Sequence, residues 1–115
     1  MANVDSNQTV RLEFFEPPMC CSTGICGPSV DKTLVQLQDD IKALKAKYLN
    51  IRIARYMITR QPLKFRANEA VYKLVKEKSR AVLPITVLNG EIIKTEQYPT
   101  LAEIEQKIAG GQHGD

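Results

Sequence analysis

The sequence predicts a single α/β domain built on a mixed four-stranded sheet with helices on both faces. Its 115 residues suit one domain. A content of 43% hydrophobic and 25% charged residues is ordinary for a globular chain. Apolar residues alternate between strand and helix periods in the order β-α-β-α-β-β-α. We expect residues 9–109 to form this domain, with a flexible extension at residues 1–8 and a flexible tail at residues 110–115.

The first strand is expected at Thr9–Phe15, where apolar and polar residues alternate in TVRLEFF. The pair Pro17-Pro18 ends it, because proline cannot donate a ladder hydrogen bond. Residues 29–48 then show the strongest helical signal. Its apolar positions recur at steps of three and four residues: Val30, Leu34, Leu37, Ile41 and Leu44. We expect Ser29 to cap this helix and Asp31 to lie in its first turn.

A second strand is expected at Asn50–Ile58 (NIRIARYMI), ended by the segment TRQP. A basic helix follows at Phe65–Lys78, with three apolar residues facing inward: Val71, Leu74 and Val75. The pair Asn89-Gly90 lies between two β-branched runs and predicts a hairpin. The hairpin strands are expected at Ile85–Leu88 and Glu91–Thr95.

The last helix is expected to begin at a capping box, Thr100-x-x-Glu103. It carries Leu101, Ile104 and Ile108 and should end at Gly110-Gly111. A β-α-β unit followed by β-β-α implies a parallel pair and then an antiparallel hairpin, which is the thioredoxin-like order. Thioredoxin-like proteins keep their reactive thiol between the first strand and helix, and hold a cis-proline facing it. Here Pro84 opens the third strand.

The three cysteines of the chain, Cys20, Cys21 and Cys26, all lie in the segment PPMCCSTGICGP. Burial as small core residues is one interpretation, but no apolar periodicity surrounds them. A thiol-disulfide oxidoreductase is a second, although it usually needs C-x-x-C. Adjacent residues have Cα atoms about 3.8 Å apart, below the usual disulfide range of about 4.4–6.8 Å. An odd cysteine count also favours free thiols in a reducing compartment.

Two metal interpretations of the same segment remain. Structural zinc needs four ligands, and the only histidine, His113, lies near the C-terminus. Thiolates select soft ions, and trivalent arsenic or antimony bonds three thiolates in a trigonal pyramid without a fourth ligand. Copper(I) is a weaker competitor. Three clustered thiols without a fourth ligand therefore favour a three-coordinate thiophilic ion.

The charge pattern contains one basic cluster: Arg60, Lys64, Arg66, Lys73, Lys76, Lys78 and Arg80. A solvated helix face is the simpler interpretation, and phosphate contacts on DNA or docking on an acidic partner is the other. A net charge of +3 does not by itself indicate nucleic-acid binding. No apolar run approaches a membrane span, and the start MANVDSNQTV is not typical of a signal peptide. We expect a cytoplasmic protein without membrane insertion.

The sequence resembles the ArsD family of arsenical-resistance metallochaperones and trans-acting operon repressors. The resemblance rests on MCCSTGICG directly after a strand, and it continues in order through VDKTLV, QPLKF, NEAV, LPITVLNGEII and YPTLAEI. It covers nearly the whole chain, from about Val10 to Ala109.

This resemblance implies a thioredoxin-like fold and binding of As(III) or Sb(III) as cargo by Cys20, Cys21 and Cys26. It also implies transfer of the metalloid to ArsA, the ATPase of an arsenite efflux pump, without enzymatic activity or a required cofactor. A metalloid-responsive, DNA-binding repressor of the resistance operon is the alternative function, and the two can coexist. A homodimer, operator DNA and thiol donors such as glutathione are the further expected partners.

Overall fold

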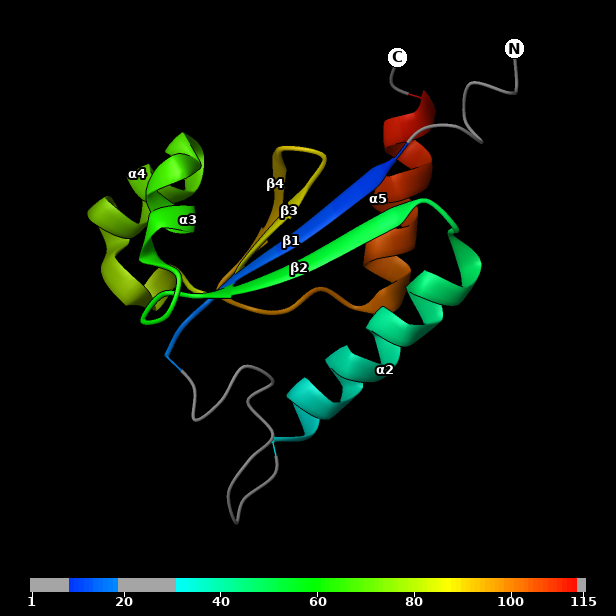
Figure 1. Ribbon diagram of the computed structural model, residues 1–115, viewed down its shortest axis with the longest axis horizontal. Coiled ribbons are helices and arrows are strands. Elements are labelled where there is room, and N and C mark those ends of the chain that lie inside the picture. Colours follow the sequence, from blue (N-terminus) through cyan, green and yellow to red (C-terminus); the bar gives the residue numbers. More distant parts are fainter. Residues whose placement is uncertain (1–8, 19–30, 114–115) are drawn as a thin grey trace.

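The computed structural model describes residues 9–18 and 31–113. A four-stranded sheet in the order β2-β1-β3-β4 lies at its centre (Figure 1). The strands are β1 (Val10–Glu16), β2 (Ile51–Met57), β3 (Ile85–Leu88) and β4 (Glu91–Thr95). β1 pairs with β2 in parallel and with β3 antiparallel, and β3 pairs antiparallel with β4. The expected mixed sheet and thioredoxin-like order are therefore confirmed.

Helices cover both faces of the sheet, as expected. Inward residues of β1, such as Leu12 and Phe14, pack with helices α2 (Lys32–Lys47) and α5 (Leu101–His113). The opposite face, which includes Phe15, packs against α3 (Pro62–Ala67), α4 (Glu69–Lys78) and the short 3-10 helix Ser79–Val82. Because successive side chains of β1 point to opposite faces of the sheet, this strand contributes residues to two separate apolar clusters.

The N-terminus of α2 differs from the expectation. Asp31, rather than Ser29, is the N-cap, because its Oδ1 accepts a hydrogen bond of 2.9 Å from the backbone N–H of Thr33. A carboxylate at this position satisfies an orphan donor and complements the helix dipole. Ser29 and Val30 lie outside the described residues.

The basic segment forms two helices instead of the single helix expected at Phe65–Lys78. α3 begins earlier, at Pro62, whose fixed φ suits the first turn of a helix. The break falls at Asn68, whose backbone is extended and whose Oδ1 accepts a hydrogen bond from Val71 N. Asn is a strong N-cap residue, so it ends one helix and starts the next.

The hairpin strands lie at the residues expected from the sequence. Asn89 and Gly90 both have positive φ, 52° and 87°. A two-residue type I′ turn needs positive φ at both central positions, which Asn-Gly supplies most readily. Asn89 also accepts a hydrogen bond of 2.8 Å from Arg11 N through its Oδ1, so the turn is tied to the start of β1.

The capping box of α5 is confirmed. Glu103 N donates to Thr100 Oγ1 at 3.1 Å, and Thr100 N donates to Glu103 Oε1 at 2.9 Å. The other end of α5 is not as expected, because the helix continues through Gly110-Gly111 to His113. A glycine inside a helix costs only about 1 kcal/mol relative to alanine, so it weakens a helix without ending it.

Thr100→Ala tests the capping box. Loss of the Thr100 hydroxyl leaves the N–H of Glu103 without its acceptor, and we expect the free energy of unfolding to fall by about 1 kcal/mol. Urea unfolding followed by circular dichroism measures the change. Thr59→Ala, at an exposed threonine in a turn, should change stability by less than about 0.5 kcal/mol. Equal losses in both variants would contradict a capping role.

Candidate functional site

The candidate site lies at one edge of the sheet. β1 and β2 are parallel and end there together, at Glu16 and Met57, and β3 begins there. The chain leaves this edge after Pro18 and returns at Asp31, where α2 begins (Figure 1). In open α/β sheets, ligands bind outside the carboxyl ends of parallel strands. This edge is therefore where the fold positions a functional segment.

The predicted thiol ligands Cys20, Cys21 and Cys26 lie outside the described residues. Their neighbours along the chain are well defined, since Cys20 follows Glu16 by four positions and Cys26 precedes Asp31 by five. No group of three His, Cys, Asp or Glu side chains that could hold a metal occurs in residues 9–18 and 31–113. His113 is the last residue of α5 rather than part of a tail.

Pro84 lies at the same edge, directly before β3. The Leu83–Pro84 peptide bond is cis, and Pro84 is buried. Ile85 pairs with Phe15 of β1, so the register brings Pro84 next to the end of β1. The Pro84 carbonyl accepts a hydrogen bond of 2.9 Å from Glu96 N. This proline therefore lies beside the end of β1 and is hydrogen-bonded to the segment after β4, at the edge from which the cysteine-bearing stretch departs.

A buried charge network holds the end of β1. The carboxylate of Glu16 has a relative exposure of 0%. It accepts two hydrogen bonds of 2.7 Å from the Arg55 guanidinium, one on each oxygen. The Tyr98 hydroxyl donates a third, to Oε1. A bidentate carboxylate–guanidinium pair is strong and directional, so the network fixes β1 to β2 and to the segment that leads into α5.

The surroundings of Arg55 and Tyr98 raise the pKa of both groups. Burial alone lowers the pKa of Arg55, but the hydrogen bonds and charge of Glu16 outweigh burial and raise that pKa above its ordinary value. Burial and the Glu16 charge both raise the pKa of Tyr98 well above its ordinary value. At neutral pH the network therefore contains a guanidinium, which donates to Glu16, and a neutral phenol.

The sequence analysis missed this network, although its signal is present in the residue pattern. Glu16 continues the inward series of β1 that begins at Val10, and Arg55 continues the inward series of β2 after Ile51 and Ile53. An acidic and a basic residue at buried positions of two adjacent strands indicate a buried pair. Tyr98 carries no comparable signal, because it lies between β4 and α5.

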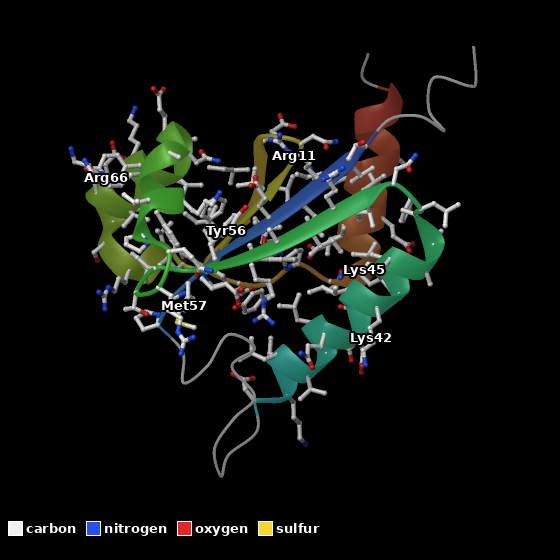
Figure 2. All side chains as sticks on the ribbon, viewed as in Figure 1. Arg11, Lys42, Lys45, Tyr56, Met57 and Arg66 are labelled. Carbon is white, nitrogen blue, oxygen red and sulfur yellow. The ribbon has the colours of Figure 1, made fainter. Side chains whose placement is uncertain are left out.

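The basic cluster lies on the α3 and α4 side of the molecule, away from α2 (Figures 1 and 2). All seven side chains are exposed: Arg60, Lys64, Arg66, Lys73, Lys76, Lys78 and Arg80. None of them forms an ion pair within residues 9–18 and 31–113. Lys64 and Lys76 lie over the rings of Tyr56 and Tyr72, at 5.6 and 5.3 Å from the centroids.

In the described part of the chain, no helix is long and apolar enough to cross a membrane.

A family model, two curated relatives and one solved structure that match this chain all concern arsenical resistance operon proteins. The model of the family "Arsenical resistance operon protein ArsD" matches residues 9–113. Two Escherichia coli proteins named arsenical resistance operon trans-acting repressor ArsD are 38% and 37% identical over 93 residues, which is 81% of this chain and 76% of each relative.

One solved structure also matches this chain. The crystal structure of an arsenical resistance operon trans-acting repressor from Bacteroides vulgatus superposes with a TM-score of 0.76 at 30% identity. The match covers 87% of this chain and 92% of that chain.

Tyr98→Phe tests the buried network. Loss of a hydrogen bond to a charged acceptor should lower the free energy of unfolding by about 1.5–3 kcal/mol at pH 7. The raised pKa of Tyr98 also fixes the direction of the pH dependence. The unfolded phenol ionises near pH 10 while the folded one stays neutral, so this stabilisation is complete below about pH 10 and is lost as pH rises further.

Urea unfolding of the wild type and of Tyr98→Phe at pH 8 and pH 11 measures both effects. Tyr72→Phe is the matched control, because the Tyr72 side chain is exposed. The gap between wild type and Tyr98→Phe should narrow at the higher pH, and the control should show no such change. A constant gap would show that Tyr98 does not hold its proton against Glu16.

Proposed function

Because the chain belongs to the ArsD family of arsenical-resistance proteins, we propose that it is a metallochaperone that binds As(III) or Sb(III) through Cys20, Cys21 and Cys26. It then passes the metalloid to an ArsA-type ATPase of an arsenite efflux pump. No bond of an organic substrate is broken, so this function is not enzymatic. The named relatives support the role in arsenical resistance, and the three-thiol site rests on the sequence.

One structural observation supports the site in particular. The three thiols lie between Glu16 and Asp31, since Cys20 follows Glu16 by four positions and Cys26 precedes Asp31 by five. Glu16 is held by the buried network, and Asp31 caps α2. A segment with both ends fixed keeps its second and third thiols at high effective concentration once the first has bound. Cys26 precedes the first residue of α2 by six positions in the sequence, and a thiol brought to a helix N-terminus is favoured as thiolate.

The chemistry of loading is a stepwise exchange. Arsenous acid has three As–OH groups, and each thiol replaces one of them by forming an As–S bond. The thiol proton leaves with the hydroxide as water, so three waters are released and no electron is transferred. In transfer to the ATPase, each partner thiol forms an As–S bond while one As–S bond to a cysteine of this chain breaks. The proton of the incoming thiol passes to the departing cysteine.

Titration of the reduced protein with arsenite tests this function. We expect one arsenic per chain, with three sulfur ligands in the X-ray absorption spectrum. Serine at any of the three cysteines should abolish three-sulfur binding, because a hydroxyl is a poor ligand for a soft ion. Ser22→Ala, in the same segment, is the matched control and should bind like the wild type. A two-sulfur site that is indifferent to one cysteine would refute the three-thiol site.

DNA binding by the same chain is a second candidate function, favoured by the names of the relatives and by the basic cluster. Residues 60–80 carry seven basic and two acidic side chains, whereas the whole chain has a net charge of only +3. The positive charge is therefore concentrated on the α3 and α4 side. Phosphate contacts need such a surface, and each contact adds to the salt dependence of binding.

Operator DNA binding at several salt concentrations tests this candidate. In Lys73→Gln/Lys76→Gln, the loss of two phosphate contacts should weaken binding and reduce the slope of log K against log salt by about one to two. Lys42→Gln/Lys45→Gln is the matched control, because these lysines lie on α2 away from the basic cluster (Figure 2). Equal slopes in both double variants would exclude α4 as the contact surface.

A further inference from the structure

Two arginines lie side by side on the face of the sheet that packs against α3 and α4. Arg11 of β1 and Arg52 of β2 are Cα partners in the parallel register, and neighbouring strands lie about 4.8 Å apart. The alternation of each strand places them on the same face as Phe15 and Tyr56. Both arginine side chains are exposed, whereas Phe15 is buried. The helices therefore cover the end of this face near Phe15 and leave the arginine pair at the surface.

The described part of the chain does not neutralise this pair. Neither arginine forms an ion pair there. Glu13, the next residue of β1 on this face, accepts a hydrogen bond of 3.3 Å from the Tyr56 hydroxyl instead. By contrast, Arg55 on the other face of β2 is paired with Glu16. Like charges directly opposite each other on adjacent strands are destabilising, so the exposed pair costs stability in the isolated protein.

Protection of the sheet edge accounts for only one of the two arginines. β2 is an edge strand in the order β2-β1-β3-β4, and a charge on an edge strand disfavours pairing with a foreign strand. β1 is a central strand with a partner on each side, so Arg11 has no such role. Sequences depart from local rules mainly at functional sites, and the pair therefore indicates a site for an anion.

The arginine pair extends the positive surface of α3 and α4. Lys64 lies over the Tyr56 ring, 5.6 Å from its centroid, and Tyr56 follows Arg52 by four residues on β2. Four residues of a strand span about 13 Å, which is well within one turn of duplex DNA, about 34 Å. In Figure 2, Arg11, Tyr56 and Arg66 follow one another from the start of β1 to α3. One DNA duplex could therefore contact the arginine pair and the basic cluster together.

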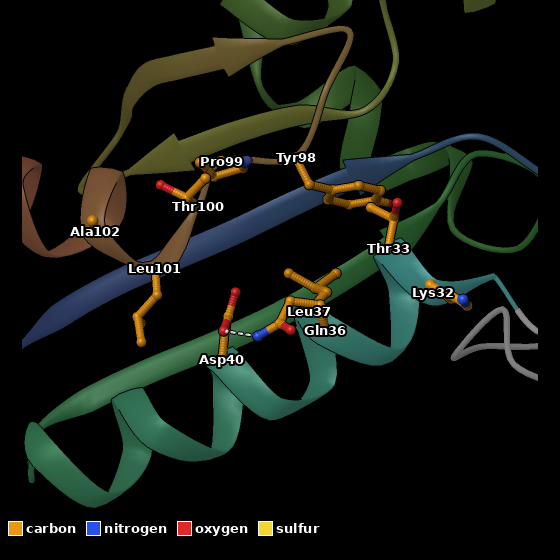
Figure 3. Close-up of a pocket in the computed structure, with 10 residues that line it drawn as sticks. All are labelled: Lys32, Thr33, Gln36, Leu37, Asp40, Tyr98, Pro99, Thr100, Leu101 and Ala102. Carbon is orange, nitrogen blue, oxygen red and sulfur yellow. Dashed lines mark hydrogen bonds between the residues drawn. The ribbon is translucent and has the colours of Figure 1, made fainter.

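The opposite face of the sheet does not suit phosphate. A largely apolar cavity of about 620 Å³ lies there, between α2 and the segment 98–102 (Figure 3). Asp40 lines it with a relative exposure of only 6%, and its Oδ1 accepts a hydrogen bond of 2.8 Å from Gln36 Nε2. Lys32 is the one cation among the described residues that line this cavity. One carboxylate offsets one ammonium there, so the surface with excess positive charge is the one that carries Arg11.

We propose that Arg11 and Arg52 form a phosphate-binding site for DNA, which extends the contact surface of α3 and α4 across the uncovered part of the sheet. This inference rests on the second proposed function, DNA binding, and names where on the chain the DNA lies. The planar guanidinium group matches the oxygens of a phosphate with two parallel hydrogen bonds. A phosphate between the two arginines also removes the repulsion that the isolated protein bears.

The salt dependence of binding to an operator duplex tests this site. In Arg11→Gln/Arg52→Gln, the loss of two phosphate contacts should weaken binding and reduce the slope of log K against log salt by about two. Affinity for an unrelated duplex of equal length should fall by the same factor, because phosphate contacts carry no sequence information. Lys42→Gln/Lys45→Gln removes the same charge from α2. It is the matched control and should keep the wild-type slope.

Two further variants separate a binding role from a structural one. Arg11→Lys/Arg52→Lys keeps both charges and should keep the wild-type slope. Arg52→Gln relieves the repulsion between the arginines, so its urea midpoint at low salt should be no lower than that of the wild type. A lower midpoint would assign the pair to the stability of the sheet and overturn the proposal.

The outcomes also separate this inference from the proposed function. A reduced slope in both Arg11→Gln/Arg52→Gln and Lys73→Gln/Lys76→Gln supports one continuous DNA surface. A wild-type slope in the arginine variant, with a reduced slope in the lysine variant, would overturn the arginine site and leave DNA binding by α4 standing. Absence of operator binding by the wild type would refute the DNA function, and the arginine site with it.

Discussion

The fold depends on one buried ion pair, because a fully buried carboxylate such as Glu16 is tolerated only where its charge is met in place. The Arg55 guanidinium, on the adjacent parallel strand, pairs with the Glu16 carboxylate. The Tyr98 hydroxyl, 82 residues further along the chain, donates a hydrogen bond to the same carboxylate. A one-residue slip of β1 against β2 would turn Glu16 to the other face of the sheet, into the apolar cluster around Phe15. The pair therefore specifies the register of the sheet, and with it the point from which the cysteine-bearing stretch departs.

The two faces of the sheet differ in the charge that they carry. α2, which begins after its N-cap Asp31, and α5 lie on the face to which Glu16 belongs. The concentrated positive charge lies on the opposite face, on and around α3 and α4. A soft, uncharged metalloid species needs no electrostatic attraction, whereas phosphate does. Under the two proposed functions, phosphate contacts would lie on the opposite face of the sheet from Glu16, after which the cysteine-bearing stretch follows.

The elements that could be predicted from the sequence are those fixed by local chemistry. Asn89-Gly90 and the Thr100–Glu103 box located the hairpin and the start of α5 correctly, because each motif satisfies backbone groups within a few residues. The break at Asn68 was missed, since Asn is tolerated both inside a helix and at its cap. Glu16, Arg55 and Tyr98 come together only through the fold, from positions up to 82 residues apart. The three cysteines were found by their clustering, and their role stays a prediction.

The strand order has a further consequence for how the protein behaves at high concentration. Among the residues that the structure describes, β2 and β4 each have a paired neighbour on one side only, so each could accept a strand from another molecule. Each strand carries charged side chains: Arg52 on β2 and Glu91 on β4 are exposed, and Lys94 on β4 pairs with Glu103. Adding a foreign strand there would strip water from these charges, which is the usual protection of sheet edges against aggregation. The same side chains that break the apolar pattern of the edge strands thus keep the sheet at four strands.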